Sequence, residues 1–102
     1  MDFRGYTLIS DLDGTLLDDN KKISDGNLEA ISYFQSKGGK FALATGRAPL
    51  RAAMFKNIIK TDIPSIFLNG ILISDFHTDE IFLEKHIDKF LYKRFSVFFY
   101  GF

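Results

Sequence analysis

The sequence contains no cysteine among its 102 residues. This absence excludes disulfide bonds, thiolate zinc sites and thiol catalysis, and it fits a reducing cytoplasm. No run of 18 apolar residues is present, so no segment is predicted to span a bilayer. The N-terminus lacks the layout of a signal peptide, because Asp2, Asp11 and Asp13 interrupt any apolar stretch. We therefore expect a cytoplasmic protein without membrane association.

The sequence also has no excess charge of either sign, since Lys plus Arg and Asp plus Glu number 13 each. No basic run indicates nucleic-acid binding, and no charge asymmetry indicates a membrane surface. What the chain does have is apolar bulk: 46 % of its residues are hydrophobic, with 12 Phe and 4 Tyr. This composition excludes disorder and predicts one small domain with a core.

Three apolar segments each end in polar residues. The first, Tyr6 to Ile9, is predicted as a buried strand and runs into Ser10-Asp11-Leu12-Asp13-Gly14. The segments 40–44 and 65–68 run into Thr45-Gly46-Arg47 and Asn69-Gly70. Two carboxylates at the end of a buried strand are costly, which indicates a cation or a reaction that uses them. In a parallel α/β sheet, ligands bind beyond the carboxyl ends of the strands, so Asp11, Thr45 and Asn69 are predicted to converge there.

The segments between these strands have helical patterns. Ser24 is a predicted N-cap, and Gly38-Gly39 stops the helix that follows it. A second helix is predicted from Pro49 to about Ile59, with an apolar face of Leu50, Ala53, Met54 and Ile58. The order is βαβαβ, which predicts a parallel sheet with right-handed crossovers.

From Gly70 onward the pattern changes. Residues 71–74 and 80–83 are predicted to form a hairpin, followed by a short helix marked by Ile87, Phe90, Leu91 and Phe95 and by a strand over 96–100. We place a boundary here, with half of an α/β core in residues 1–69 and the start of an α+β unit in residues 70–102.

Sequential strand order has a geometric consequence for the first unit. Right-handed crossovers put both helices on one face of the sheet, and the other face then lacks a cover. The C-terminal segment could fold back over it, a second chain could cover it in a homo-oligomer, or this chain could be the first part of a longer protein.

The motifs at the three strand ends resemble those of the haloacid dehalogenase-like phosphohydrolases. Asp11-Leu12-Asp13-Gly14-Thr15 is similar to the DxDGT signature of that family. Ala44-Thr45-Gly46-Arg47 and Asn69-Gly70 resemble the second motif and the third strand end of its Cof-type branch. The resemblance covers residues 6 to about 74 closely. It implies a Rossmann-like parallel sheet followed by an α+β cap.

The resemblance also implies a chemistry. Asp11 would attack a phosphate ester to form an aspartyl-phosphate, and Asp13 would act as general acid and base. Mg²⁺ would be held by the Asp11 carboxylate and the Asp13 main-chain carbonyl. Thr45 would hydrogen-bond the phosphate together with the N–H groups that follow each strand. The remaining residues of the implied phosphate and substrate site are Gly46, Arg47, Asn69 and Gly70.

The sequence departs from the family after Asn69. The family also needs a lysine that balances the phosphate charge and a late acidic motif of the GDxxND kind, and neither is recognisable here. Lys85 and Lys89 lie in the cap-like part, so the resemblance does not assign the lysine's role to either of them. An EF-hand calcium loop starting at Asp11 is excluded, because its positions 6 and 12 hold Leu16 and Lys22.

Other polar residues have ordinary explanations. Lys21-Lys22 is expected to be a solvated loop, and His77 and His86 are expected at exposed positions rather than as ligands. Asn69-Gly70 is also a common hairpin dipeptide.

Three functions remain open at this point. The first is a Mg²⁺-dependent phosphatase of small phosphorylated metabolites, present here as a fragment that is inactive alone. The second is a phosphotransferase or phosphomutase using the same aspartate, and the third a truncated product that binds Mg²⁺ or phosphate weakly or needs a partner chain. Sugar phosphates and cofactor precursors such as flavin or pyridoxal phosphates all fit as substrates.

Overall fold

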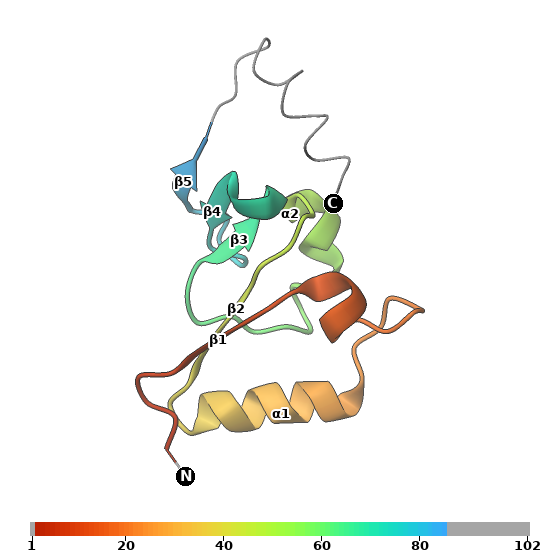
Figure 1. The fold of residues 1–102 in the computed structure, drawn as a ribbon, viewed down its shortest axis with the longest axis vertical. Coiled ribbons are helices and arrows are strands. Elements are labelled where there is room, and N and C mark those ends of the chain that lie inside the picture. Colours follow the sequence, from red (N-terminus) through yellow and green to blue (C-terminus); the bar gives the residue numbers. More distant parts are fainter. Residues whose placement is uncertain (1, 86–102) are drawn as a thin grey trace.

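The computed structural model describes residues 2–85, and its elements follow the predicted alternation of strands and helices (Figure 1). The strands are β1 (Thr7–Ser10), β2 (Lys40–Leu43), β3 (Ser65–Phe67), β4 (Leu72–Ser74) and β5 (Ile81–Glu84). The helices are α1 (Asp25–Ser36) and α2 (Pro49–Ala52), and shorter helical turns cover Leu12–Leu16, Ala53–Phe55 and Leu68–Gly70. The helix and strand predicted between residues 87 and 100 lie outside the described residues.

The strands are arranged in the order β1-β2-β3-β4-β5. β1 and β2 pair in parallel along their whole length, which confirms the predicted parallel sheet. β3 joins the opposite edge of β2 through one parallel bridge between Ala44 and Ile66. β4 pairs antiparallel with β3, and β5 antiparallel with β4, so the predicted hairpin is confirmed. That a separate unit begins at Gly70 stays a prediction.

Side chains from the loop before β3 and from the first residue of β3 replace part of the ladder between β2 and β3. The Asp62 carboxylate accepts a hydrogen bond of 2.9 Å from the Phe41 N–H, and the Ser65 hydroxyl accepts one of 3.0 Å from the Leu43 N–H. These bonds satisfy backbone donors that would otherwise be buried without a partner. β2 and β3 are therefore hydrogen-bonded neighbours, although only one residue pair forms a direct backbone bridge between them.

Helix α1 begins and ends where the sequence predicts. The Ser24 hydroxyl accepts a hydrogen bond of 3.1 Å from the Asn27 N–H, as an N-cap does. Gly38 follows the last turn with φ of +92°, a backbone conformation that glycine adopts without strain. Within residues 2–85 no helix is long and apolar enough to cross a bilayer.

The core forms where both helical segments meet the sheet. Phe41 and Leu43, alternate residues of β2, project from one face of the strand and are fully buried. Side chains from α1, from the segment after α2 and from β3 belong to the same cluster, namely Ile31, Phe55, Ile59 and Phe67.

The second helix differs from its prediction in both length and buried face. The α-helical turn stops at Ala52 and continues as a tighter 3₁₀ turn over Ala53–Phe55, well short of Ile59. The predicted apolar face is wrong, because Leu50 is 86 % exposed and Met54 and Ile58 are exposed as well. This segment has two apolar stripes at helical spacing, and the one that carries the phenyl ring, Ala52-Phe55-Ile59, is the one that is buried.

The predicted burial of the first strand is also wrong. Tyr6, Leu8 and Ile9 are exposed, with Ile9 at 49 %. The reason is that β1 is the edge strand of the described sheet and has a neighbour on one side only. On its other side, no strand within residues 2–85 pairs with the backbone N–H and C=O groups of β1.

Candidate active site

The ends of β1, β2 and β3 meet at one hollow of about 460 Å³. This is the geometry predicted for the carboxyl edge of a parallel sheet. The hollow brings together five of the seven predicted site residues, namely Asp11, Thr45, Gly46, Asn69 and Gly70. The other two, Asp13 and Arg47, pair with each other.

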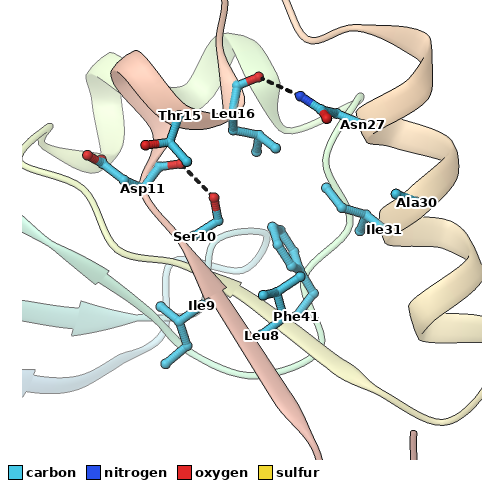
Figure 2. A pocket seen from close by; sticks show the side chains of 10 residues that line it. All are labelled: Leu8, Ile9, Ser10, Asp11, Thr15, Leu16, Asn27, Ala30, Ile31 and Phe41. Carbon is cyan, nitrogen blue, oxygen red and sulfur yellow. Dashed lines mark hydrogen bonds between the residues drawn. The ribbon is translucent and has the colours of Figure 1, made fainter. Parts of the chain in front are cut away.

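Asp11 is held by the turn that follows β1. Its Oδ1 atom accepts a hydrogen bond of 2.7 Å from the Leu12 N–H, and the Ser10 hydroxyl donates to its main-chain oxygen at 2.8 Å (Figure 2). Within residues 2–85, Oδ2 accepts no hydrogen bond. The chain turns away at Gly14, whose φ of +76° lies in the left-handed region. The carboxylate is therefore fixed through one oxygen and has the other available to a ligand.

Thr45 is the buried member of the site. Its N–H donates to the Ile66 carbonyl at 2.9 Å, and its own carbonyl accepts from the Asn69 N–H at 3.2 Å. Its hydroxyl oxygen accepts from the Arg47 N–H at 3.1 Å, which leaves the hydroxyl hydrogen able to donate. Because Thr45 lines the hollow, this hydrogen suits an anion bound there.

The third strand end is strained. Leu68, Asn69 and Gly70 have φ values of +52°, +53° and +100°. Glycine and asparagine tolerate this region, but leucine does so only where surrounding contacts enforce it. The segment also lies close to Gly46, where an added Cβ would approach the Asn69 Oδ1 atom to 3.2 Å. The absence of a side chain at Gly46 lets the two strand ends come together.

Asp13 and Arg47 form a bidentate ion pair. Arg47 Nε lies 2.7 Å from Asp13 Oδ2, and one terminal nitrogen of Arg47 lies 2.8 Å from Oδ1. Another guanidinium nitrogen donates to the Arg51 carbonyl at 2.8 Å, and the guanidinium lies 5.6 Å from the centre of the Phe55 ring. The bonds from Arg47 lower the pKa of Asp13 to about 2, and the same pairing raises the pKa of Arg47.

Lys21 is a member of the site that the sequence did not identify. Lys21 and Lys22 lie in an exposed loop as predicted, and Lys21 Nζ in addition lies 3.1 Å from Asp13 Oδ1. The sequence did not predict this ion pair, because it depends on the chain folding back between residues 17 and 23. Asp13 thus has two cations against its carboxylate. His77, by contrast, lies exposed as predicted, and His86 is outside the described residues.

Replacing Arg47 by Met is expected to alter how stability depends on pH. The folded-state pKa of Asp13 is about 2, below its ordinary value of 3.8, so its ion pair stabilises the fold above pH 4. That stabilisation is lost as the pH falls through 2, and it amounts to at most about 1 kcal/mol because the side chain is 36 % exposed. Urea unfolding at pH 4.5 and pH 2.5 should show a smaller loss for Arg47→Met than for wild type. Arg51→Met is the matched control, and equal pH dependence in both variants would contradict the assignment.

A second hollow of about 420 Å³ runs along the free edge of β1 and reaches α1 (Figure 2). Its walls are mainly apolar side chains, including Leu8, Ile9 and Ile31. Asp11 borders this hollow as well as the first one. The candidate nucleophile thus lies where the polar site meets the uncovered edge of the sheet.

The donors near Asp11 suit a hard cation. The structure provides the Asp11 carboxylate oxygen that accepts no hydrogen bond, and the family resemblance adds the main-chain carbonyl of Asp13, whose side chain is already paired. No group of three or more His, Cys, Asp or Glu side chains within residues 2–85 could enclose a metal ion. Mg²⁺ commonly uses one or two protein oxygens and keeps several waters, so two donors of this kind fit it better than they fit zinc.

A family model and the curated relatives of this chain all point to the same family. The family model described as haloacid dehalogenase-like hydrolase matches residues 8–101. A 5-amino-6-(5-phospho-D-ribitylamino)uracil phosphatase of Bacillus subtilis is 32 % identical over 73 residues, covering 72 % of this chain and 27 % of its own length. A pyridoxal phosphate phosphatase of Escherichia coli is 31 % identical over 71 residues, covering 70 % of this chain and 26 % of its own length.

The fold agrees with solved structures. A haloacid dehalogenase-like hydrolase from B. subtilis superposes with a TM-score of 0.70 at 32 % identity, covering 91 % of this chain and 33 % of that one. The chain therefore spans about a third or less of the length of the relatives it matches.

Proposed function

Since the chain belongs to the haloacid dehalogenase-like hydrolases, we propose that it carries the nucleophile half of a Mg²⁺-dependent phosphatase site. The observation that supports this most directly is the convergence of Asp11, Thr45 and Asn69 at one hollow. An anion there would meet the Thr45 hydroxyl and the main chain of two strand ends. Small phosphorylated metabolites are the proposed substrates, and pyridoxal phosphate and phosphorylated heterocyclic precursors are the first to try, because the relatives named above act on such esters.

The proposed reaction has two steps. In the first, a carboxylate oxygen of Asp11 bonds to phosphorus, the ester P–O bond breaks, and Asp13 gives a proton to the leaving oxygen. In the second, water attacks the aspartyl-phosphate, passes a proton to Asp13, and the bond between phosphorus and Asp11 breaks to release phosphate. Mg²⁺ bound at the Asp11 carboxylate and the Asp13 carbonyl would offset the negative charge between nucleophile and phosphate.

The ion pairs of Asp13 bear on these two roles. With a pKa of about 2 the carboxyl is ionised near neutral pH, which is the form that accepts a proton from water in the second step. Donating a proton in the first step requires that at least one of its two cations moves away. A carboxylate with a pKa this low is also a weak base, so we expect Asp13 to need the release of at least one of its two cations in both roles.

Beryllium trifluoride, a mimic of a phosphorylated carboxylate, tests this half-site without requiring turnover. We expect ¹⁹F NMR to detect a complex with the 102-residue chain in the presence of Mg²⁺ and no complex with Asp11→Asn. Binding that is equal in both proteins, or equal with and without Mg²⁺, would contradict the proposal. Asp25→Asn, at an exposed carboxylate in the first turn of α1, is a control that should bind as wild type does.

A second candidate is a product that binds Mg²⁺ and phosphate without turning over. It is supported by the absence from the sequence of a recognisable phosphate-balancing lysine downstream and of the late acidic motif. Within residues 2–85, β1 has a neighbouring strand on one side only, which leaves its other side open to polypeptide outside this range, to a longer chain or to a second copy. Beryllium trifluoride binding without hydrolysis of phosphate esters would favour this candidate.

A further inference from the structure

The loop after the candidate nucleophile is a closed hairpin. Leu17 and Ile23 form an antiparallel bridge at its base. The Asp18 carboxylate accepts hydrogen bonds of 2.8 Å and 3.0 Å from the N–H groups of Asn20 and Lys22. Lys21, near the tip, has a backbone φ of +60°, which is uncommon for a residue other than glycine. The hairpin backbone is thus fixed in a form that directs the Lys21 side chain back to Asp13.

The two cations on Asp13 are held very differently. Arg47 uses both carboxylate oxygens, is anchored further by the Arg51 carbonyl and the Phe55 ring, and is 19 % exposed. Lys21 makes one contact of 3.1 Å and is 58 % exposed. Arg47 alone already pairs both oxygens of Asp13. The Lys21 ammonium can therefore leave without stranding a charge.

We propose that Lys21 binds the phosphate group of the substrate, moving its ammonium from Asp13 to a phosphate monoester held beside Asp11. This inference rests on the proposed function, because it needs an anion in the hollow formed by the three strand ends. A phosphate dianion beside the Asp11 carboxylate requires a nearby positive charge. The lysine ammonium can supply it, because it carries three N–H donors at the end of a flexible side chain. Lys21 would then take part of the charge-balancing task for which no downstream lysine is recognisable in this sequence.

Inorganic phosphate is the probe for this inference. It is titrated into the full 102-residue chain with Mg²⁺ present, and binding is followed through the amide signals of Thr45 and Gly46 by ¹⁵N NMR. We expect Lys21→Met to weaken binding about five- to tenfold and Lys21→Arg to restore most of it. Lys22→Met is the matched control, since it removes an equal charge from the neighbouring residue of the same hairpin. Its affinity should stay within about twofold of wild type.

The possible outcomes distinguish a failure of the Lys21 inference from a failure of the proposed phosphatase function. Unchanged affinity in Lys21→Met, or an equal loss in Lys22→Met, overturns the role of Lys21 and leaves the phosphate site standing. No binding to wild type overturns the role of Lys21. Whether the phosphatase assignment falls with it is decided by the beryllium trifluoride complex, which depends on Asp11. Unperturbed amide signals in the core show that each variant is folded.

Discussion

If the 102-residue chain hydrolyses p-nitrophenyl phosphate with Mg²⁺, replacing Asp11 by Asn is expected to remove that hydrolysis, lowering kcat by at least about 10³-fold. An amide oxygen is a far weaker nucleophile than a carboxylate, and the substitution also removes the negative charge that attracts Mg²⁺. The fold should persist, because Asn Oδ1 can accept the same hydrogen bond from the Leu12 N–H that Asp11 accepts now. Initial rates with and without Mg²⁺, measured on the 102-residue chain, provide the test.

Asp19→Asn is the control for the charge change, since Asp19 is an exposed acid on the nearby hairpin and is no part of the proposed site. It should retain the wild-type rate. Mg²⁺-dependent turnover that survives in Asp11→Asn would show that another group is the nucleophile. A folded wild-type chain without turnover would favour the second candidate, a product that binds Mg²⁺ and phosphate without hydrolysing the ester.

The second large effect concerns stability. Phe41→Ala is expected to lower the free energy of unfolding by about 3–5 kcal/mol, because it opens a cavity at a fully buried position in the middle of β2. That is a large share of the total stability of a small domain, so much of the variant should be unfolded near body temperature. Urea titration followed by circular dichroism measures the change.

Phe82→Ala provides the comparison, since it deletes the same ring from an exposed position on β5. Its free energy of unfolding should change by no more than about 1 kcal/mol. Similar losses in the two variants would mean that the core is not centred on β2. The pair also tests whether the β1–β2 part of the sheet, with its free edge, holds its core without further polypeptide.

The site was predictable from the sequence because its signals are local. Asp11, Thr45 and Asn69 each follow an apolar strand segment directly, and a parallel sheet gathers such strand ends at one edge. The start and end of α1 were predictable for the same reason, since a cap and a stop are properties of a few neighbouring residues. The second helix was harder, because Leu50-Met54-Ile58 and Ala52-Phe55-Ile59 are both apolar at helical spacing.

The sequence by itself determined the α/β class, the parallel pairing of β1 with β2, and five of the seven residues that line the hollow at the strand ends. Only the tertiary structure decided that β1 is an exposed edge of the sheet in residues 2–85, because burial depends on which neighbours a strand has. It also decided that Arg47 and Lys21 both meet Asp13, 34 and 8 residues away along the chain. Charged side chains pair according to how the backbone folds, and no local pattern at Asp13 encodes its two partners.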